Sequence, residues 1–91
     1  MSVQIFKPSA ELTFNTVQCD SVRLMELFKD HHTSSVSFDL AGVSLCDSAG
    51  LALLIEAKRL CMEFGKELVM KEIPKAILSL AEFCGVEAML E

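Results

Sequence analysis

Apolar and polar residues alternate in two stretches of the chain, which is the pattern of a half-buried β-strand. Residues 11–15 place Leu12 and Phe14 on one face, and residues 35–40 alternate in the same way. Strands that are covered by helices on both faces are instead continuous apolar runs. The alternation therefore predicts a sheet whose helices all lie on one side, and it disfavours a doubly wound fold.

Three other segments have apolar residues at the spacing of an amphipathic helix, and each has a recognisable start or stop. Asp20 and Ser48 are residue types that cap helix N-termini, Pro74 is favoured in a first turn, and glycine ends helices in the left-handed conformation. The predicted helices run from Asp20 to Lys29 or His31, from Ser48 to Phe64 before Gly65, and from Pro74 to Gly85.

A third strand is predicted at residues 67–71, and short edge strands are predicted at residues 3–6 and around Met89 and Leu90. Strands therefore alternate with helices, which implies right-handed crossovers and a sheet that is at least partly parallel. We expect an α/β fold with a mixed four- to five-stranded sheet and about three helices packed on one face. The 91 residues suffice for one small domain, residues 1–91.

Composition and charge exclude several classes of function. The chain is 52% hydrophobic, which allows a packed core, and its net charge is −5 with no cluster of Lys or Arg. Binding to nucleic acid or to an anionic membrane surface is therefore not expected. The longest apolar run, residues 51–55, is far shorter than the roughly 20 residues of a membrane span, and no signal peptide is recognisable. We expect a soluble cytoplasmic protein without membrane insertion.

Catalytic and metal-binding patterns are also missing from the sequence. The histidines, His31 and His32, fall at the far end of a predicted helix, where a frayed end explains them, and no nucleophile elbow, carboxylate pair or glycine-rich phosphate loop is present. The four cysteines are widely spaced without a C-x-x-C motif. We therefore expect no enzyme, no metal site and no cofactor.

The junction at Asp47 and Ser48 carries the functional signal, because a strand-like run ends there and the longest helix begins. A helix N-terminus has free backbone N–H groups and the positive end of the helix dipole. Ser48 can therefore be a simple cap, an anion site or a phosphorylation switch. Asp47 can equally take the cap position, which would release Ser48 into the first turn.

The central helix divides into faces at 100° per residue. The solvent face comprises Ala52, Glu56, Arg59 and Glu63, and the core face comprises Leu53, Leu54, Ala57, Leu60, Cys61 and Phe64. Leu51, Ile55 and Met62 lie outside both arcs, so they either pack on a neighbouring helix or contact a partner. Ala49 and Gly50 are small, so another protein's backbone can approach Ser48 closely.

Residues 35–90 resemble STAS domains, which occur in anti-sigma factor antagonists, in the cytoplasmic tails of sulfate transporters and in the small STAS subunit of the Mla phospholipid-transport ABC complex. The resemblance rests on Asp-Leu-x-x-Val at residues 39–43, Cys-Asp-Ser-Ala-Gly-Leu at 46–51, and the helix, glycine, strand and proline-initiated helix that follow. Residues 1–30 fit by element order only.

The resemblance implies a role for Ser48, which matches the serine or threonine at the start of the second STAS helix. In anti-sigma factor antagonists a partner kinase phosphorylates that hydroxyl, whereas in the Mla subunit it lies at the contact with the ABC ATPase. Residues 51–54 and the free-standing length are more similar to the Mla subunit, and a sulfate-transporter tail is disfavoured because no membrane segment precedes the domain.

The leading hypothesis is a non-catalytic subunit, peripheral to the inner membrane through its partner, that binds and stabilises the ATPase of a phospholipid-transport ABC system. The residues expected to contact the partner are Cys46, Asp47, Ser48, Ala49, Gly50, Leu51, Ala52 and Ile55. An alternative is an anti-sigma factor antagonist that is released from its kinase by phosphorylation of Ser48. A third possibility is a small-ligand carrier whose cavity is lined by some of the six Phe and five Met residues.

Overall fold

The computed structural model describes residues 2–29 and 33–90. His31 and His32, which the sequence assigns to a helix end, lie outside the described residues. In chain order the elements are β1 (Ser2–Phe6), β2 (Glu11–Leu12), α1 (Val17–Phe28), β3 (Thr33–Asp39), β4 (Leu45–Cys46), α2 (Ser48–Glu63), β5 (Glu67–Lys71), α3 (Lys75–Phe83) and the 3₁₀ helix η1 (Glu87–Leu90).

The strands form two separate parallel ladders in place of the mixed four- to five-stranded sheet that we expected. The larger sheet has the order β1-β3-β5, and the smaller one pairs β2 with β4. The strand expected at residues 11–15 ends at Leu12, because the carbonyl of Thr13 accepts hydrogen bonds from the amides of Thr16 and Val17, at 2.9 Å each, and turns the chain into α1. The smaller ladder pairs Glu11 with Leu45 and Leu12 with Cys46, and it does not join the larger sheet.

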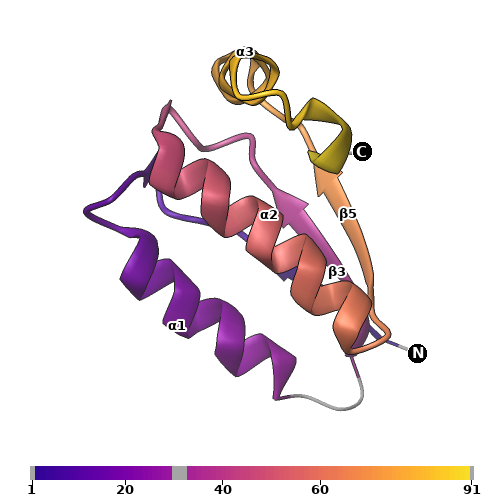
Figure 1. The fold of residues 1–91 in the computed structure, drawn as a ribbon. Helices are drawn as coiled ribbons and strands as arrows, with labels where there is room; N and C mark the ends of the chain where they lie inside the picture. Colours follow the sequence, from indigo (N-terminus) through magenta and orange to yellow (C-terminus); the bar gives the residue numbers. More distant parts are fainter. Residues whose placement is uncertain (1, 30–32, 91) are drawn as a thin grey trace.

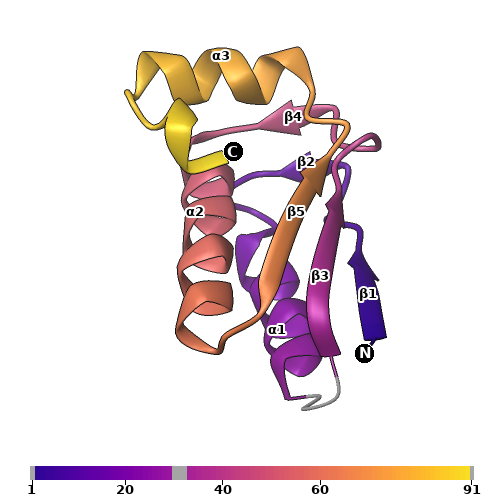
Figure 2. The ribbon, with the colours of Figure 1, turned by 90° about the vertical axis from the view of Figure 1, so that its right-hand side faces the viewer.

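Helices α1 and α2 lie side by side on one face of the larger sheet (Figure 1, Figure 2). This confirms the predicted one-sided helix layer for these two helices. Helix α3 instead lies across one end of the molecule, where it packs against α2 and β4 (Figure 2).

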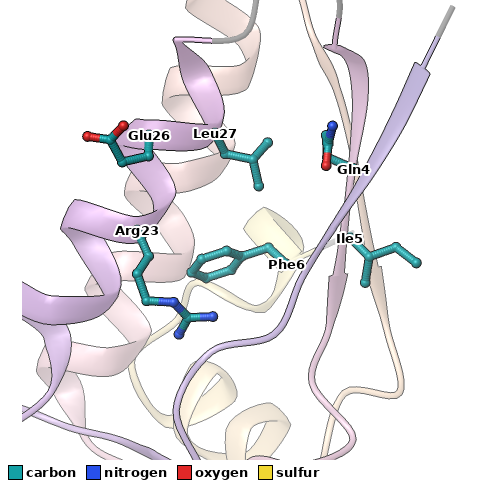
Figure 3. Close-up of a pocket in the computed structure, with 6 residues that line it drawn as sticks. All are labelled: Gln4, Ile5, Phe6, Arg23, Glu26 and Leu27. Carbon is teal, nitrogen blue, oxygen red and sulfur yellow. The ribbon is translucent and has the colours of Figure 1, made fainter.

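Helix α1 begins at Val17, upstream of the predicted cap Asp20. Asp20 is fully buried and accepts hydrogen bonds from the amide and hydroxyl of Ser9, at 3.2 and 2.9 Å, and from Arg23 at 3.0 Å. A buried carboxylate needs such partners. Asp20 therefore ties α1 to the segment after β1. The Arg23 guanidinium lies over the ring of Phe6 at 5.0 Å (Figure 3).

The remaining element ends follow the sequence closely. Gly65 ends α2 with a φ of 68° and Gly85 follows α3 with a φ of 73°, which are left-handed conformations that favour glycine. Strand β5 has the predicted bounds, and β1 is an edge strand as expected. The edge strand expected around Met89 is wrong, because these residues form η1.

The space between the larger sheet and the helices is filled by one hydrophobic core. Its fully buried large apolar residues are Leu12, Leu24, Val36, Phe38, Leu40, Leu54 and Ile77. On the solvent face of α2, Arg59 forms ion pairs with Glu56 and Glu63. Phe64 departs from the predicted core face, since it is 54% exposed and stacks on Phe28 at the core margin.

Gly50 lets α2 lie directly against β2. A Cβ atom at Gly50 would stand 1.9 Å from the carbonyl oxygen of Leu12 and 3.0 Å from the sulfur of Cys46. Neither the strand carbonyl nor the helix backbone can yield by that much without a shift of the whole contact. The first turn of α2 therefore depends on the absence of a side chain at Gly50.

We expect Gly50→Ala to lower the free energy of unfolding by about 1–3 kcal/mol, the usual cost of overpacking a tight contact. The matched control is Gly42→Ala, because nothing lies within 4 Å of a Cβ at that position. Urea unfolding followed by circular dichroism measures both variants. Equal stability of Gly50→Ala and Gly42→Ala would contradict the close approach.

Candidate functional site

The N-terminus of α2 is capped by Asp47, whose carboxylate also holds the loop after β2. One carboxylate oxygen accepts a hydrogen bond from the amide of Gly50 at 3.0 Å, and the other accepts one from the amide of Phe14 at 3.0 Å. The amide of Asp47 donates to the carbonyl of Leu12 at 3.3 Å. Asp47 thus fastens residues 12–14, which are far away in the sequence, to the start of α2.

These backbone bonds determine the ionisation of the site. The amide of Phe14, and next that of Gly50, lower the pKa of Asp47 below its ordinary value, because they stabilise the carboxylate. Burial, and next the charge of Asp47, raise the pKa of Cys46 to about 11. The Cys46 thiol is therefore protonated at neutral pH, and it is neither an activated nucleophile nor a prepared metal ligand.

Because Asp47 takes the cap, Ser48 is the first residue of α2 and its side chain is exposed. Of the two alternatives that the sequence left open, the structure selects the Asp47 cap. The hydroxyl of Ser48 stands at the positive end of the helix dipole, where negative charge is stabilised. Ala52, one turn further along, is exposed as well, and Ala49 is partly exposed.

The structure does not bring all of the expected contact residues to the surface. Leu51 is only 3% exposed and Gly50 is buried, so Leu51 packs in the core and Gly50 lies against β2. Ile55 is partly buried against the same core. Met62, the other apolar residue outside the two predicted faces, is 74% exposed near the far end of α2. The accessible part of the junction is therefore smaller than the predicted segment.

Phe14 is a surface residue of this junction that the sequence analysis missed. Its amide is bonded to Asp47, while its side chain is 78% exposed. The alternation of Leu12 and Phe14 suggested a core residue, but the sequence Thr-Phe-Asn-Thr at residues 13–16 is rich in turn-forming types that could have placed it in a loop.

A shallow groove between α1 and α2 continues from Ser48 along the helices. It is lined by Val17, Gln18, Ser21, Ala49, Ala52 and Leu53, with Glu56 at one side. We define the docking surface as Phe14, Ser48, Ala49, Ala52 and this groove. It is a shallow apolar surface with a polar margin.

The ligand-carrier alternative predicted that Phe residues line an internal cavity. Three of them face outward, with exposed fractions of 78% for Phe14, 54% for Phe64 and 90% for Phe83. The hollow beside β1, between Phe6 and Leu27, is an open surface depression that Arg23 partly fills (Figure 3). These observations disfavour the cavity on which that alternative depends.

Within residues 2–29 and 33–90, no group of three or more His, Cys, Asp or Glu side chains is arranged to hold a metal ion. The described helices include none with both the length and the apolar character needed to cross a bilayer.

The lowered pKa of Asp47 predicts a pH dependence of stability. A carboxylate whose pKa is depressed in the folded state adds stability above its ordinary pKa of 3.8, and this stability is lost as the pH falls through the lower folded value. We expect Asp47→Asn to be less stable than the parent protein at pH 7 and to approach it below pH 3.8. Urea unfolding across this range measures the difference. Ser48→Ala is the control, and its free energy of unfolding should depend on pH in the same way as that of the parent protein. A difference in the free energy of unfolding between Asp47→Asn and the parent that does not change with pH would contradict the lowered pKa of Asp47.

Comparisons with known proteins identify the family and the fold. A family model described as Mlab, STAS domain matches residues 9–91, which include the whole docking surface. No curated protein matches the chain. The crystal structure of a sulfate transporter family protein from Wolinella succinogenes aligns with a TM-score of 0.77 at 18% identity, over 98% of this chain and 71% of that one, and this likeness shows the fold alone. STAS domains are generally non-catalytic regulatory or interaction domains. On the family match, this chain belongs to the STAS domain family.

Proposed function

We propose that the protein is an MlaB-like STAS subunit that binds and stabilises the ATPase of a phospholipid-transport ABC system. The observation that carries the proposal is the N-terminus of α2, where exposed Ser48 lies beside the small residues Ala49 and Ala52. Phe14 is held at the same helix end by its backbone amide, which donates to Asp47, and its side chain is exposed. The description of the matching family model supports the assignment to the MlaB-like branch.

The physical character of the docking surface suits a protein partner. Ala49 and Ala52 have side chains too short to hold another backbone away, and an exposed aromatic ring such as Phe14 is the residue type that anchors interfaces. The surface is shallow, whereas small-molecule sites are concave and enclose most of their ligand. A partner helix or loop therefore fits better than a small substrate.

The groups at the junction support a binding role over catalysis. Asp47 is engaged by two backbone amides, and the Cys46 thiol is protonated, so neither is free to act as a base or nucleophile. We infer that the subunit acts by holding the ATPase in one conformation. Its place at the inner membrane, on the cytoplasmic side, would follow from that partner.

Ala52→Glu places a large charge in the docking surface, and we expect it to reduce retention of the ABC ATPase by at least tenfold. The matched control is Met62→Glu, which introduces the same charge at an exposed position further along α2. Tagged proteins are purified from detergent-solubilised native membranes, and the ATPase is quantified by mass spectrometry. Equal retention by both variants, with both folded by circular dichroism, would reject the docking surface.

A regulatory switch is the second candidate, and the exposed hydroxyl of Ser48 favours it specifically. Because Asp47 supplies the cap, phosphorylation of Ser48 does not disrupt it, while the added charge at the helix N-terminus would repel an acidic partner. An anti-sigma kinase with ATP should then add one phosphate to the parent protein and none to Ser48→Ala. Recovery of an ABC ATPase with Ser48 unmodified would favour the transport subunit instead.

A further inference from the structure

The larger sheet has one face without a covering helix in the described part of the chain (Figure 2). The side chain of Ile5 projects from β1 on the side opposite to Phe6 and Arg23 (Figure 3). By strand alternation and register, we define the open face as Val3, Ile5, Lys7, Ser35, Ser37, Asp39, Glu67, Val69 and Lys71.

This open face is unusual for its topology. Sheets that are entirely parallel are almost always covered on both faces, because each face carries apolar side chains. Here Val3 is 64% exposed, Ile5 65% and Val69 39%. The register places Ile5, Ser37 and Val69 in one row across the three strands, so a stripe runs across the face with exposed apolar side chains at Ile5 and Val69 and the small, 5% exposed Ser37 between them. Such a stripe gains stability when another surface covers it.

Two of the charges on this face, Glu67 and Lys71, are arranged to complement themselves, whereas Lys7 and Asp39 form an ion pair with each other at 4.0 Å within the chain. Strand β5 carries Glu67 at one end and Lys71 at the other, with Val69 between them on the same face. Consider a two-fold axis that lies between two copies and runs parallel to the row of Ile5, Ser37 and Val69. It would pack the open face of one copy on that of the other, with the strands of the two copies antiparallel. Glu67 would then face the Lys71 of a second copy, Lys71 would face its Glu67, and the apolar stripes would pack together.

We propose that the open face is a dimer interface, and that its occupant is a second copy of this chain. A second copy of the chain already carries Glu67 and Lys71 in the positions that match these two charges. An unrelated protein would need its own matching pair, so the two charges favour a second copy as the occupant. The open face lies on the side of the sheet away from α1 and α2, so the dimer leaves the docking surface accessible (Figure 2).

The size of the face sets the strength of the dimer. Three strands and five residues span about 15 by 17 Å at the usual strand spacing and rise. This is well below the roughly 800 Å² that each partner buries in a standard stable interface. We therefore expect a weak dimer whose population depends on protein concentration.

Charge reversal with rescue tests the interface, with sedimentation equilibrium over a concentration series as the measurement. Glu67→Lys and Lys71→Glu each place like charges opposite one another, and each should raise the dissociation constant at least tenfold. The double variant Glu67→Lys/Lys71→Glu exchanges the two charges and should restore it. Glu63→Lys, which makes the same charge change on the solvent face of α2, should leave it unchanged.

Circular dichroism confirms that each variant is folded before its assembly is compared. A parent protein that stays monomeric up to millimolar concentration would overturn the proposal. A dimer that is insensitive to both reversals would place the contact elsewhere and overturn it equally. If Glu67→Lys and Lys71→Glu lower retention of the ABC ATPase while the parent protein stays monomeric, a different protein covers the face and the second copy is rejected.

Discussion

The close contact between the first turn of α2 and strand β2 is the constraint on which the rest of the structure depends. Gly50 permits the approach because a Cβ atom would stand 1.9 Å from the Leu12 carbonyl oxygen, and Asp47 secures it with one carboxylate oxygen on each segment. The helix therefore cannot rotate or slide without breaking the cap. This is why Ser48 and Phe14 face outward together, although they come from different parts of the chain.

The same contact decides what kind of site can exist there. The junction is closed by backbone hydrogen bonds, and the carboxylate of Asp47 is already engaged by amides of the chain itself. The free features are a hydroxyl, two small side chains and an aromatic ring on a shallow surface. STAS domains are generally non-catalytic regulatory or interaction domains, and these features suit that class.

The parallel topology divides the molecule into two sides with different physical roles. On one side, α1 and α2 bury the apolar residues of all three strands, including Phe38 and Val36 in the central strand β3. On the other side, alternation leaves serines in β3 but Val3 and Ile5 in the edge strand β1. This side therefore has polar residues along its central strand and exposed apolar residues on both of the strands beside it.

Local pattern in the sequence determined the three α-helices, the strands β3 and β5, the start of α2 and the glycine stop at Gly65, because periodicity and capping act over a few residues. The family signature at residues 46–51 likewise pointed to the junction before its geometry was known. Only the tertiary structure decided that the strands split into two parallel ladders, that Leu51 is buried and that Phe14 is exposed. These outcomes depend on hydrogen bonds between segments more than thirty residues apart, such as the one from Phe14 to Asp47, and no local pattern encodes which distant groups will meet.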